Sequence, residues 1–441
     1  MLKRLGQELD NTNAMVLFKN ANFPTPFPSE LEYSCSARGC WNIVHTGFLM
    51  PEAHEIYVCA AGCLRGVVLT AAEMQASERF STIEIREENV LEGNMEELLI
   101  NGVSDILEQL PYKPKAVQIF TSCIHHFIGC DLKLCYQILR KNYPAIDFTD
   151  CYMNPIMRKS GLTPDQIMRK QLYSLLHKRS QNNKKINIIG NNIATRKNSE
   201  LYKLAESAGY EVTEIHDCKN YQDYQDMASA SANICYHATA KPAGEMLFEK
   251  LNQKLLYLPL NYSYGEIQHY LAIYANYLNI IPPDWSEQIA LCENKITQVR
   301  NLIGETPIAI DSSATMRPLG LAKFLLEHKF NIFRIYADSF SQEEKQDFYW
   351  VQENYPDLQL FAISQIKMRM LPRKSNIKTI AIGQKAAYFL NTPYFINTVE
   401  NGGFWGFSGI IGMLELLEDA FITEKNTKKL VQIKGLGCGT V

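Results

Sequence analysis

The sequence lacks every local cysteine motif that marks a small metal or redox site. It contains 12 cysteines, yet no two of them are spaced as C-x-x-C. This absence excludes zinc ribbons, thioredoxin-like dithiols and the cysteine run of bacterial ferredoxins. Cysteines that bind a metal in this chain must therefore come together from distant loops.

The chain also lacks a strong net charge and a long apolar segment. Its 44 basic and 47 acidic residues give a formal net charge of −3, which excludes a general polyanion-binding protein. The longest uncharged stretches, 267–283 and 401–414, contain polar residues and fall short of the roughly 18 apolar residues of a spanning helix. No signal-peptide hydrophobic region follows Met1. We expect a cytoplasmic chain that binds neither nucleic acid nor membrane and keeps its thiols reduced.

Glycine-rich phosphate loops are missing as well. The segments 401–403 and 434–439 are rich in glycine, but neither follows a strand and opens a helix as a G-x-G-x-x-G or Walker A loop does. Nucleotide binding by this chain is therefore not predicted.

Short β-branched and aromatic runs alternate with amphipathic runs along the whole sequence. This alternation is typical of βα units that build mostly parallel sheets. Strands are predicted at 55–59, 116–121, 186–190, 233–236, 254–258, 307–310, 330–335 and 378–383. Amphipathic helices are predicted at 199–208, 287–302, 320–329 and 412–421.

Two polar segments divide this pattern into three parts. A basic run at 178–185 precedes a predicted strand, and a turn at 304–307 follows a predicted helix. A chain of 441 residues also suggests three domains at about 150 residues each. We predict three α/β domains with Rossmann-like parallel sheets, comprising residues 1–183, 184–304 and 305–441.

Several cysteines directly follow predicted strands. Cys59 and Cys63 come after the first strand, Cys123 after the second, and Cys235 lies at the end of the fourth. Ligands of open α/β sheets bind beyond the carboxyl ends of the strands, and thiolates favour iron–sulfur clusters over hard cations. Free cysteines are also common in cores. Metal ligands, reactive thiols and buried apolar residues all remain open interpretations at this point.

The residues around the cysteines resemble those of nitrogenase component 1 and its relatives. Three segments carry the resemblance: 38–41 (RGCW), 60–63 (AAGC) and 121–132 (TSCIHHFIGCDL). Cys63 follows Cys40 by 23 residues and Cys123 follows Cys63 by 60 residues, which is similar to the intervals in that family.

Two further segments extend the resemblance to the active-site cofactor of the nitrogenase alpha subunit. The segment 233–236 (NICY) is similar to its cofactor-binding Cys-Tyr element, and 405–409 (WGFSG) is similar to its His-Gly-Phe-Asp-Gly element. Trp405 stands where that subunit has the histidine that binds the cofactor, and His237 replaces the arginine that follows Cys-Tyr. An indole cannot bind a metal, so dinitrogen reduction is not expected.

The resemblance implies three domains around a central cleft and an iron–sulfur cluster, [4Fe-4S] or larger. Cys40, Cys63 and Cys123 would supply thiolates at an interface where a second component 1-like subunit completes the coordination. Cys235 would hold a second cluster or face a substrate. Two additional candidate ligands are Cys35 and Cys59. Candidate residues for outer hydrogen bonds or substrate contacts are His125, His126, His237, Arg317 and Trp405.

We therefore predict a nitrogenase-like reductase subunit that takes electrons from an ATP-dependent [4Fe-4S] iron protein. It would work as a homo- or hetero-oligomer. One alternative is a non-catalytic scaffold on which an iron–sulfur cofactor is assembled. Another is an α/β binding protein that has kept the fold and lost the cluster.

Overall fold

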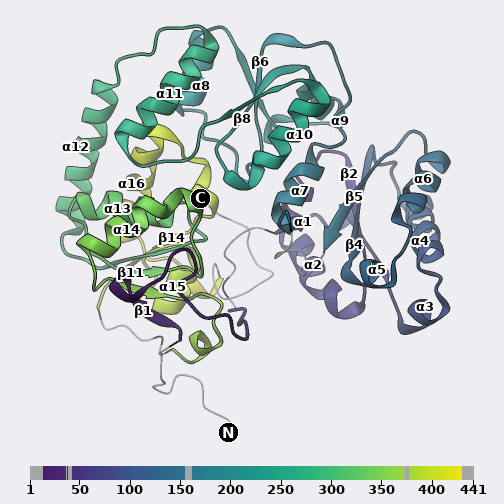
Figure 1. Cartoon of the computed structure of the whole chain (residues 1–441), viewed down its shortest axis with the longest axis horizontal. Helices are drawn as coiled ribbons and strands as arrows, with labels where there is room; N and C mark the ends of the chain where they lie inside the picture. Colours follow the sequence, from purple (N-terminus) through teal and green to yellow (C-terminus); the bar gives the residue numbers. More distant parts are fainter. Residues whose placement is uncertain are drawn as a thin grey trace. The chain divides into compact units, whose positions relative to one another are not determined.

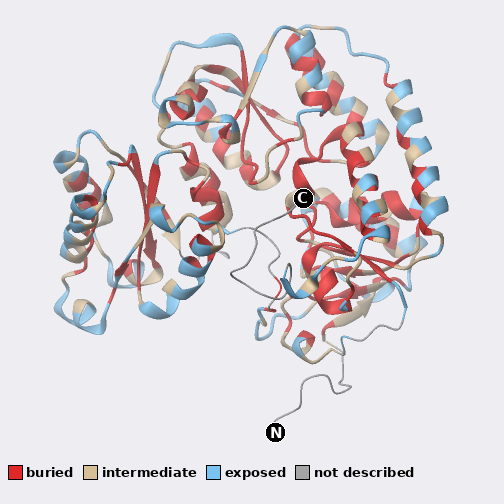
Figure 2. Cartoon of the chain, turned by 180° about the vertical axis from the view of Figure 1, so that it is seen from behind, coloured by how far each residue is buried: buried red, intermediate tan, exposed pale blue. Residues whose placement is uncertain are grey.

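The computed structural model describes residues 13–35, 37, 42–153, 161–371, 373 and 377–429. The chain divides into two compact units. Unit 1 comprises Met1–Cys40, Ile193–Leu204 and Leu260–Val441, and unit 2 comprises Trp41–Asn192 and Ala205–Pro259. In each unit the central strands are largely buried and the outward faces of the helices are exposed (Figure 2).

Unit 2 begins with a four-stranded parallel sheet. Its strands, in spatial order, are β3 (Phe80–Glu84), β2 (Ala53–Cys59), β4 (Ala116–Ser122) and β5 (Asp147–Met153). Every residue of β2 and β4 is buried because helices cover both faces of the sheet. These two strands form the centre from which the predicted thiols emerge.

In the described part of the chain, seven α-helices surround this sheet. They are α1 (Ile43–Gly47), α2 (Ala61–Glu73), α3 (Glu87–Glu92), α4 (Met95–Gln109), α5 (Cys123–Ile128), α6 (Leu132–Asn142) and α7 (Pro164–Leu172). Figure 1 shows α4 and α6 on one face and α1, α2 and α7 on the other. Because side chains alternate along a strand, Ile56 and Val58 pack toward α4 while Tyr57 packs toward α1 and α2.

A second four-stranded parallel sheet completes unit 2. Its strands, in spatial order, are β7 (Glu211–Glu214), β6 (Asn182–Ile188), β8 (Ala230–Cys235) and β9 (Lys254–Tyr257). The helices α9 (Tyr221–Asp226) and α10 (Lys241–Leu251) belong to it, and α8 (Glu200–Ser207) contributes residues to both units. A shared apolar core joins α7 and α10.

Unit 1 contains a six-stranded sheet. Its spatial order is β1 (Met15–Leu17), β12 (Gln359–Phe361), β11 (Ile332–Tyr336), β10 (Ile308–Asp311), β13 (Ile380–Ile382) and β14 (Phe395–Ile396). Only β1 is antiparallel to its neighbour within this sheet. The helices of unit 1 are α11 (Tyr264–Leu278), α12 (Ser286–Ile303), α13 (Pro318–Glu327), α14 (Lys345–Asn354), α15 (Gln384–Leu390) and α16 (Gly406–Ile422).

The predicted alternation of strands and helices is confirmed. Each of the eight predicted strands overlaps a strand of the structure, and all pairings except that of β1 are parallel. The three predicted domain boundaries remain predictions. Among the helices that the structure describes, none is long and apolar enough to cross a membrane.

Candidate functional site

Three of the predicted thiols lie at one edge of the first sheet. Cys59 is the last residue of β2, Cys63 is the third residue of α2, and Cys123 is the first residue of α5. Strands β2 and β4 are parallel neighbours, with Val58 opposite Thr121. Their carboxyl ends therefore bring the three cysteines to the same edge, as the strand-end rule predicts.

The three thiols differ in their access to solvent. Cys59 is fully buried, Cys123 is partly buried and Cys63 is exposed. The amide of Cys63 donates to the Ala60 carbonyl over 2.9 Å, which turns the chain from β2 into α2. Around Gly62 a Cβ atom would meet nothing within 4 Å, so the start of α2 is open on one side.

Burial and charge keep the Cys59 thiol protonated. Burial, followed by the proximity of Cys63 and Cys123, raises the pKa of Cys59 to about 12. A thiol must lose its proton to bind a metal, so a metal at this edge would have to displace that proton.

His125 lies in the first turn of α5 with one ring nitrogen fixed. The Ser122 amide donates to His125 Nδ1 over 3.2 Å, so the proton of the neutral ring resides on Nε2. The imidazole is buried, which lowers its pKa, and Nε2 has no partner among the described residues. His126 instead lies over the Tyr152 ring, with 5.8 Å between ring centroids.

Two further candidate ligands, Cys35 and Cys40, precede this sheet in the sequence. Cys40 lies outside the described residues. Cys35 belongs to unit 1, where it is buried in the apolar core beside Tyr336 and Phe361. Its thiol lies 3.7 Å from the Ala37 carbonyl oxygen.

Cys235 ends β8 in the second sheet of unit 2. It is fully buried, and its thiol donates to the His237 carbonyl over 3.0 Å. His237 is buried too, and burial followed by the nearby Arg169 holds its imidazole pKa well below the usual value. Nδ1 of His237 has no partner among the described residues. This environment is that of a packed core.

Arg169 was not predicted from the sequence, although it organises the loop after β6. Its side chain is almost fully buried, forms an ion pair with Asp165 at 3.1 Å and donates to the Gly190 carbonyl. The Gly190 amide donates to the Tyr173 hydroxyl over 3.0 Å. The only signal for this role was an arginine four residues after an aspartate, a spacing that is common on exposed helices.

Arg317 immediately precedes α13, and both terminal nitrogens of its guanidinium bond within unit 1, while its buried Nε has no partner among the described residues. Nη2 lies 2.8 Å from Asp347 Oδ2 and 3.2 Å from the Glu343 carbonyl, and Nη1 lies 3.2 Å from the Leu260 carbonyl. The side chain is only 11% exposed, and these contacts give it a structural role. Contact of Arg317 with an anionic substrate stays a prediction.

Trp405 precedes α16 and is buried in unit 1. Its carbonyl accepts a hydrogen bond from the Ser199 hydroxyl at 3.4 Å. Nearby, the Glu200 carboxylate accepts from the Ser408 amide and from the Ser408 hydroxyl, each over 3.0 Å. The indole therefore belongs to the packed start of α16.

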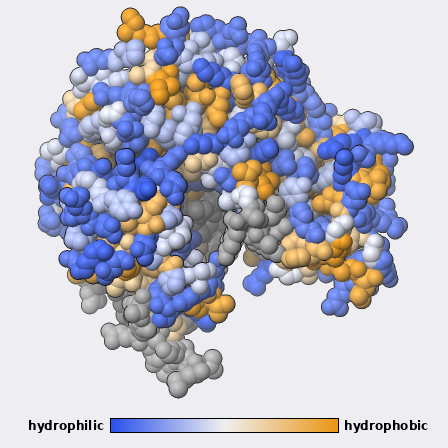
Figure 3. Space-filling view, viewed as in Figure 1, coloured by the Kyte–Doolittle hydropathy of each residue, from blue (hydrophilic) through white to orange (hydrophobic). Residues whose placement is uncertain are grey.

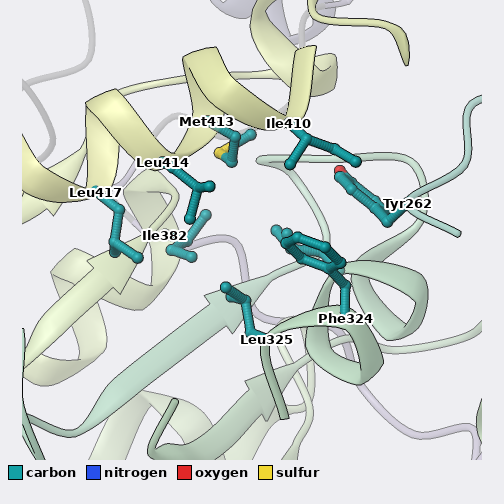
Figure 4. A pocket seen from close by; sticks show the side chains of 9 residues that line it. Tyr262, Phe324, Leu325, Ile382, Ile410, Met413, Leu414 and Leu417 are labelled. Carbon is teal, nitrogen blue, oxygen red and sulfur yellow. The ribbon is translucent and has the colours of Figure 1, made fainter. Parts of the chain in front are cut away.

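A small apolar cavity in unit 1 is a poor candidate for a binding site. Its volume is about 10 Å³, and Figure 4 shows side chains of α13, α16 and β13 converging on it with Tyr262 at its rim. A space of this size holds at most one water molecule, which an apolar lining does not bind.

Cys59, Cys63 and Cys123 come from three different elements at one edge of the first sheet, which we call the thiol edge. Among the described residues, no group of three or more His, Cys, Asp or Glu side chains is arranged to hold one metal ion. A cluster is larger than one ion and takes its thiolates from several elements, as Cys59, Cys63 and Cys123 would provide them.

Comparisons with known proteins agree with the fold. Two solved structures of nitrogenase Cp1 are similar to this chain. The one at pH 6.5 has a TM-score of 0.65 and 12% identity, covering 90% of this chain and 94% of the other. The one at pH 5 has a TM-score of 0.57 and 13% identity, covering 93% and 94%.

A search of curated proteins found no match. The sequence model of the nitrogenase component 1 type oxidoreductases, however, matches residues 35–421. That span includes the thiol edge of unit 2, the segment around Cys235 and most of unit 1. The chain belongs to the nitrogenase component 1 type oxidoreductase family.

Proposed function

We propose that this chain is a nitrogenase-like reductase subunit that carries an iron–sulfur cluster at the thiol edge of unit 2. The observation that carries the proposal is that Cys59, Cys63 and Cys123 lie at one edge of the first sheet. An ATP-dependent [4Fe-4S] iron protein would supply the electrons, since this chain has no nucleotide-binding loop of its own.

Cys63 and Cys123 would act as ligands, together with Cys40 from outside the described residues. Cys59 is the additional ligand closest to them, and its high pKa keeps its proton in place until a metal competes for the sulfur. When bound, an iron–sulfur cluster supplies one-electron redox chemistry. His125 follows Cys123 by two residues, and its Nε2 proton would be a hydrogen-bond donor for a cluster sulfur, which would raise the reduction potential.

A second subunit would complete this site. Cys63 is exposed, and a Cβ at Gly62 or Gly66 would meet no described residue within 4 Å, so this side of α2 would have room for another chain. Val68 and Leu69 are exposed farther along α2. Figure 3 shows hydrophobic side chains among hydrophilic ones on the visible face of unit 2.

The substrate would differ from dinitrogen. Trp405 cannot bind a metal, and the Cys235 thiol already donates to the His237 carbonyl. A cofactor bound through Cys235 would have to displace this hydrogen bond. The predicted ligand role of Cys235 is therefore weaker than that of the cysteines at the thiol edge.

A scaffold for cofactor assembly is the second candidate. The exposure of Cys63 favours it, because a cluster that is handed to another protein must be reachable from solvent. Electron transfer separates the two functions. We would mix the anaerobic chain and its second subunit with reduced iron protein and MgATP, and follow the cluster by electron paramagnetic resonance. A reductase subunit gives ATP-dependent reduction of its cluster, whereas a scaffold gives none.

A further inference from the structure

Beneath α1, a group of buried oxygen atoms lacks hydrogen-bond donors. Glu55 on β2 and Gln118 on β4 are both fully buried. Neither carboxyl oxygen of Glu55 nor Oε1 of Gln118 has a partner of normal geometry among the described residues. The Tyr57 hydroxyl interacts with the Glu55 carboxyl and has no other partner. Unsatisfied buried polar atoms are rare and costly, so this group requires an explanation.

The Glu55 and Gln118 side-chain oxygens lie close together below the end of α1. Glu55 and Gln118 are directly opposite each other in the β2–β4 register. A Cβ atom on Gly47, the last residue of α1, would lie 2.2 Å from Glu55 Oε1 and 2.6 Å from Gln118 Oε1. The helix therefore ends directly above both oxygens, with no room for a side chain.

One proton satisfies the whole group. A protonated Glu55 donates its O–H to Gln118 Oε1, while the Tyr57 hydroxyl donates to the other Glu55 oxygen. Every unpaired acceptor then has a donor. We propose that Glu55 carries a proton at neutral pH, donates a hydrogen bond through it to Gln118 Oε1, and through this neutral contact keeps α1 packed on the sheet that ends in the thiols.

The amide of Gln118 cannot replace this proton. Its Nε2 already donates to the Gly47 carbonyl over 3.0 Å. Rotating the amide toward Glu55 would leave that carbonyl facing Gln118 Oε1, which exchanges one unpaired acceptor for another.

Arg79 does not neutralise the carboxyl directly either. Its guanidinium donates to the carbonyls of Ala53, Phe48 and Met50, and no ion pair joins it to Glu55 in the described part of the chain. Burial raises the pKa of Glu55 well above its usual value, with Tyr57 and Arg79 opposing the shift. The other titratable group facing it is Cys151 on β5. On α1, His45 is turned toward Asn42, with Nδ1 3.1 Å from the Asn42 amide.

This contact makes Glu55 a positioning residue. Once ionised, Glu55 would place a negative charge beside Gln118 Oε1 and the carbonyl end of α1. The Tyr57 hydroxyl would then be the single hydrogen-bond donor to the carboxylate among the described residues. The repulsion would loosen α1 as the pH rises. Helix α1 packs against α2 through Val44 and Val67, and Asn42 donates to Thr70 over 3.2 Å. A loosened α1 would therefore weaken the packing of α2, the helix that carries Cys63.

The test compares the wild-type chain with Glu55→Gln, which keeps the shape of the neutral acid. Infrared spectra at neutral pH should show a protonated-carboxyl C=O band that shifts in D2O and is missing from Glu55→Gln. Amide exchange of residues 43–47, corrected for intrinsic rates, should increase at least about tenfold between neutral and strongly alkaline pH in the wild type. It should stay flat in Glu55→Gln.

A matched control is Glu344→Gln, which removes another buried glutamate with a raised pKa, in unit 1. It should keep the pH response of α1. If Glu55→Gln does not fold, Gln118→Leu should shift the carboxyl band, because the acceptor is gone. An unchanged band in the folded variant, or equal exchange in wild type and Glu55→Gln, would overturn the proposal. Only the effect on Cys63 as a ligand rests on the proposed function, since these readouts need no iron.

Discussion

Arg317 and Asp347 form a buried ion pair with 2.8 Å between Nη2 and Oδ2, and their side chains are only 11% and 14% exposed. This pair joins the residue before α13 to α14. It gives Arg317 a structural role at a position where the sequence alone suggested contact with an anionic substrate.

We predict that Arg317→Met lowers the free energy of unfolding by about 3–5 kcal/mol, because it takes the closer and more buried of two cations from the Asp347 carboxylate. Lys323→Met is the matched control. Its ammonium lies 3.7 Å from the same carboxylate but is 30% exposed, so its removal should cost less than about 1 kcal/mol. Denaturant unfolding measures both. Equal, small losses would show that the Arg317 pair does not support the fold.

Glu344 should make stability depend on pH near neutrality. Burial raises its pKa from 4.5 to about 7, while hydrogen bonds from the Leu319 and Ser341 amides oppose the shift. Between these two pH values the unfolded chain has released the proton that the folded chain still holds. This group therefore costs the folded state stability as the pH rises from about 4.5 to 7.

Glu344→Gln removes this titration and keeps an oxygen for the Leu319 amide, 2.8 Å away. The free energy of unfolding of the variant relative to wild type should increase by about 3 kcal/mol at most between pH 5 and pH 8. Unfolding curves at both pH values test this. A difference that is constant with pH would contradict the raised pKa.

Two glycines with left-handed backbones should differ sharply in their tolerance of alanine. Gly190 has φ +84°, and its Cβ would lie 2.1 Å from the Ala240 Cβ, whereas Gly209 has φ +69° and open space. Gly209→Ala should cost about 1 kcal/mol from backbone strain alone. Gly190→Ala should cost at least about 2 kcal/mol more, because the loop beside β8 must also move. Similar losses of stability in the two variants would contradict this, because they would mean that Ala240 can move away from the new Cβ at little cost in free energy.

The cysteines of the thiol edge should differ in reactivity when no metal is bound. A pKa of about 12 leaves Cys59 about 10⁻⁴ ionised at pH 8, and it is buried. Iodoacetamide should therefore modify the exposed Cys63 and spare Cys59, as mass spectrometry of the peptides would show. Bound iron should protect Cys63, and its removal by a chelator should restore the reaction. Equal labelling of Cys59 and Cys63 in the folded chain would contradict the burial of Cys59.

Much of the fold was predictable because its central strands are apolar. Strands β2 and β4 are buried throughout, and their largely apolar sequences predict them clearly. Strand β5 was missed because its residues, D-F-T-D-C-Y-M, mix polar and apolar types without a regular alternation. Strand β1 has three residues and pairs with β12, where Met15 lies opposite Phe361. A pairing over that sequence separation leaves no local pattern.

The sequence allowed us to predict the residues whose positions follow from the order of the strands. It did not allow us to predict contacts that depend on how the side chains pack. Cys59, Cys63 and Cys123 lie at the same sheet edge because β2 and β4 are parallel neighbours, which follows from βα alternation. The partner of Arg317 lies 30 residues away on another helix, and neither residue stands out in the sequence. Glu55 follows His54 in an otherwise apolar run, a sign that was available, yet its unpaired oxygens depend on the exact position of α1.

Iron and acid-labile sulfide in the anaerobically purified chain test the central claim most directly. The comparison is between Cys123→Ala and Cys135→Ala, which removes a fully buried thiol from the core packed between the sheet and α4. We expect a brown wild-type protein with several irons and sulfides per chain, loss of most of both in Cys123→Ala, and full retention in Cys135→Ala. A colourless, iron-free wild type, or unchanged iron in Cys123→Ala, would contradict a cluster at this edge.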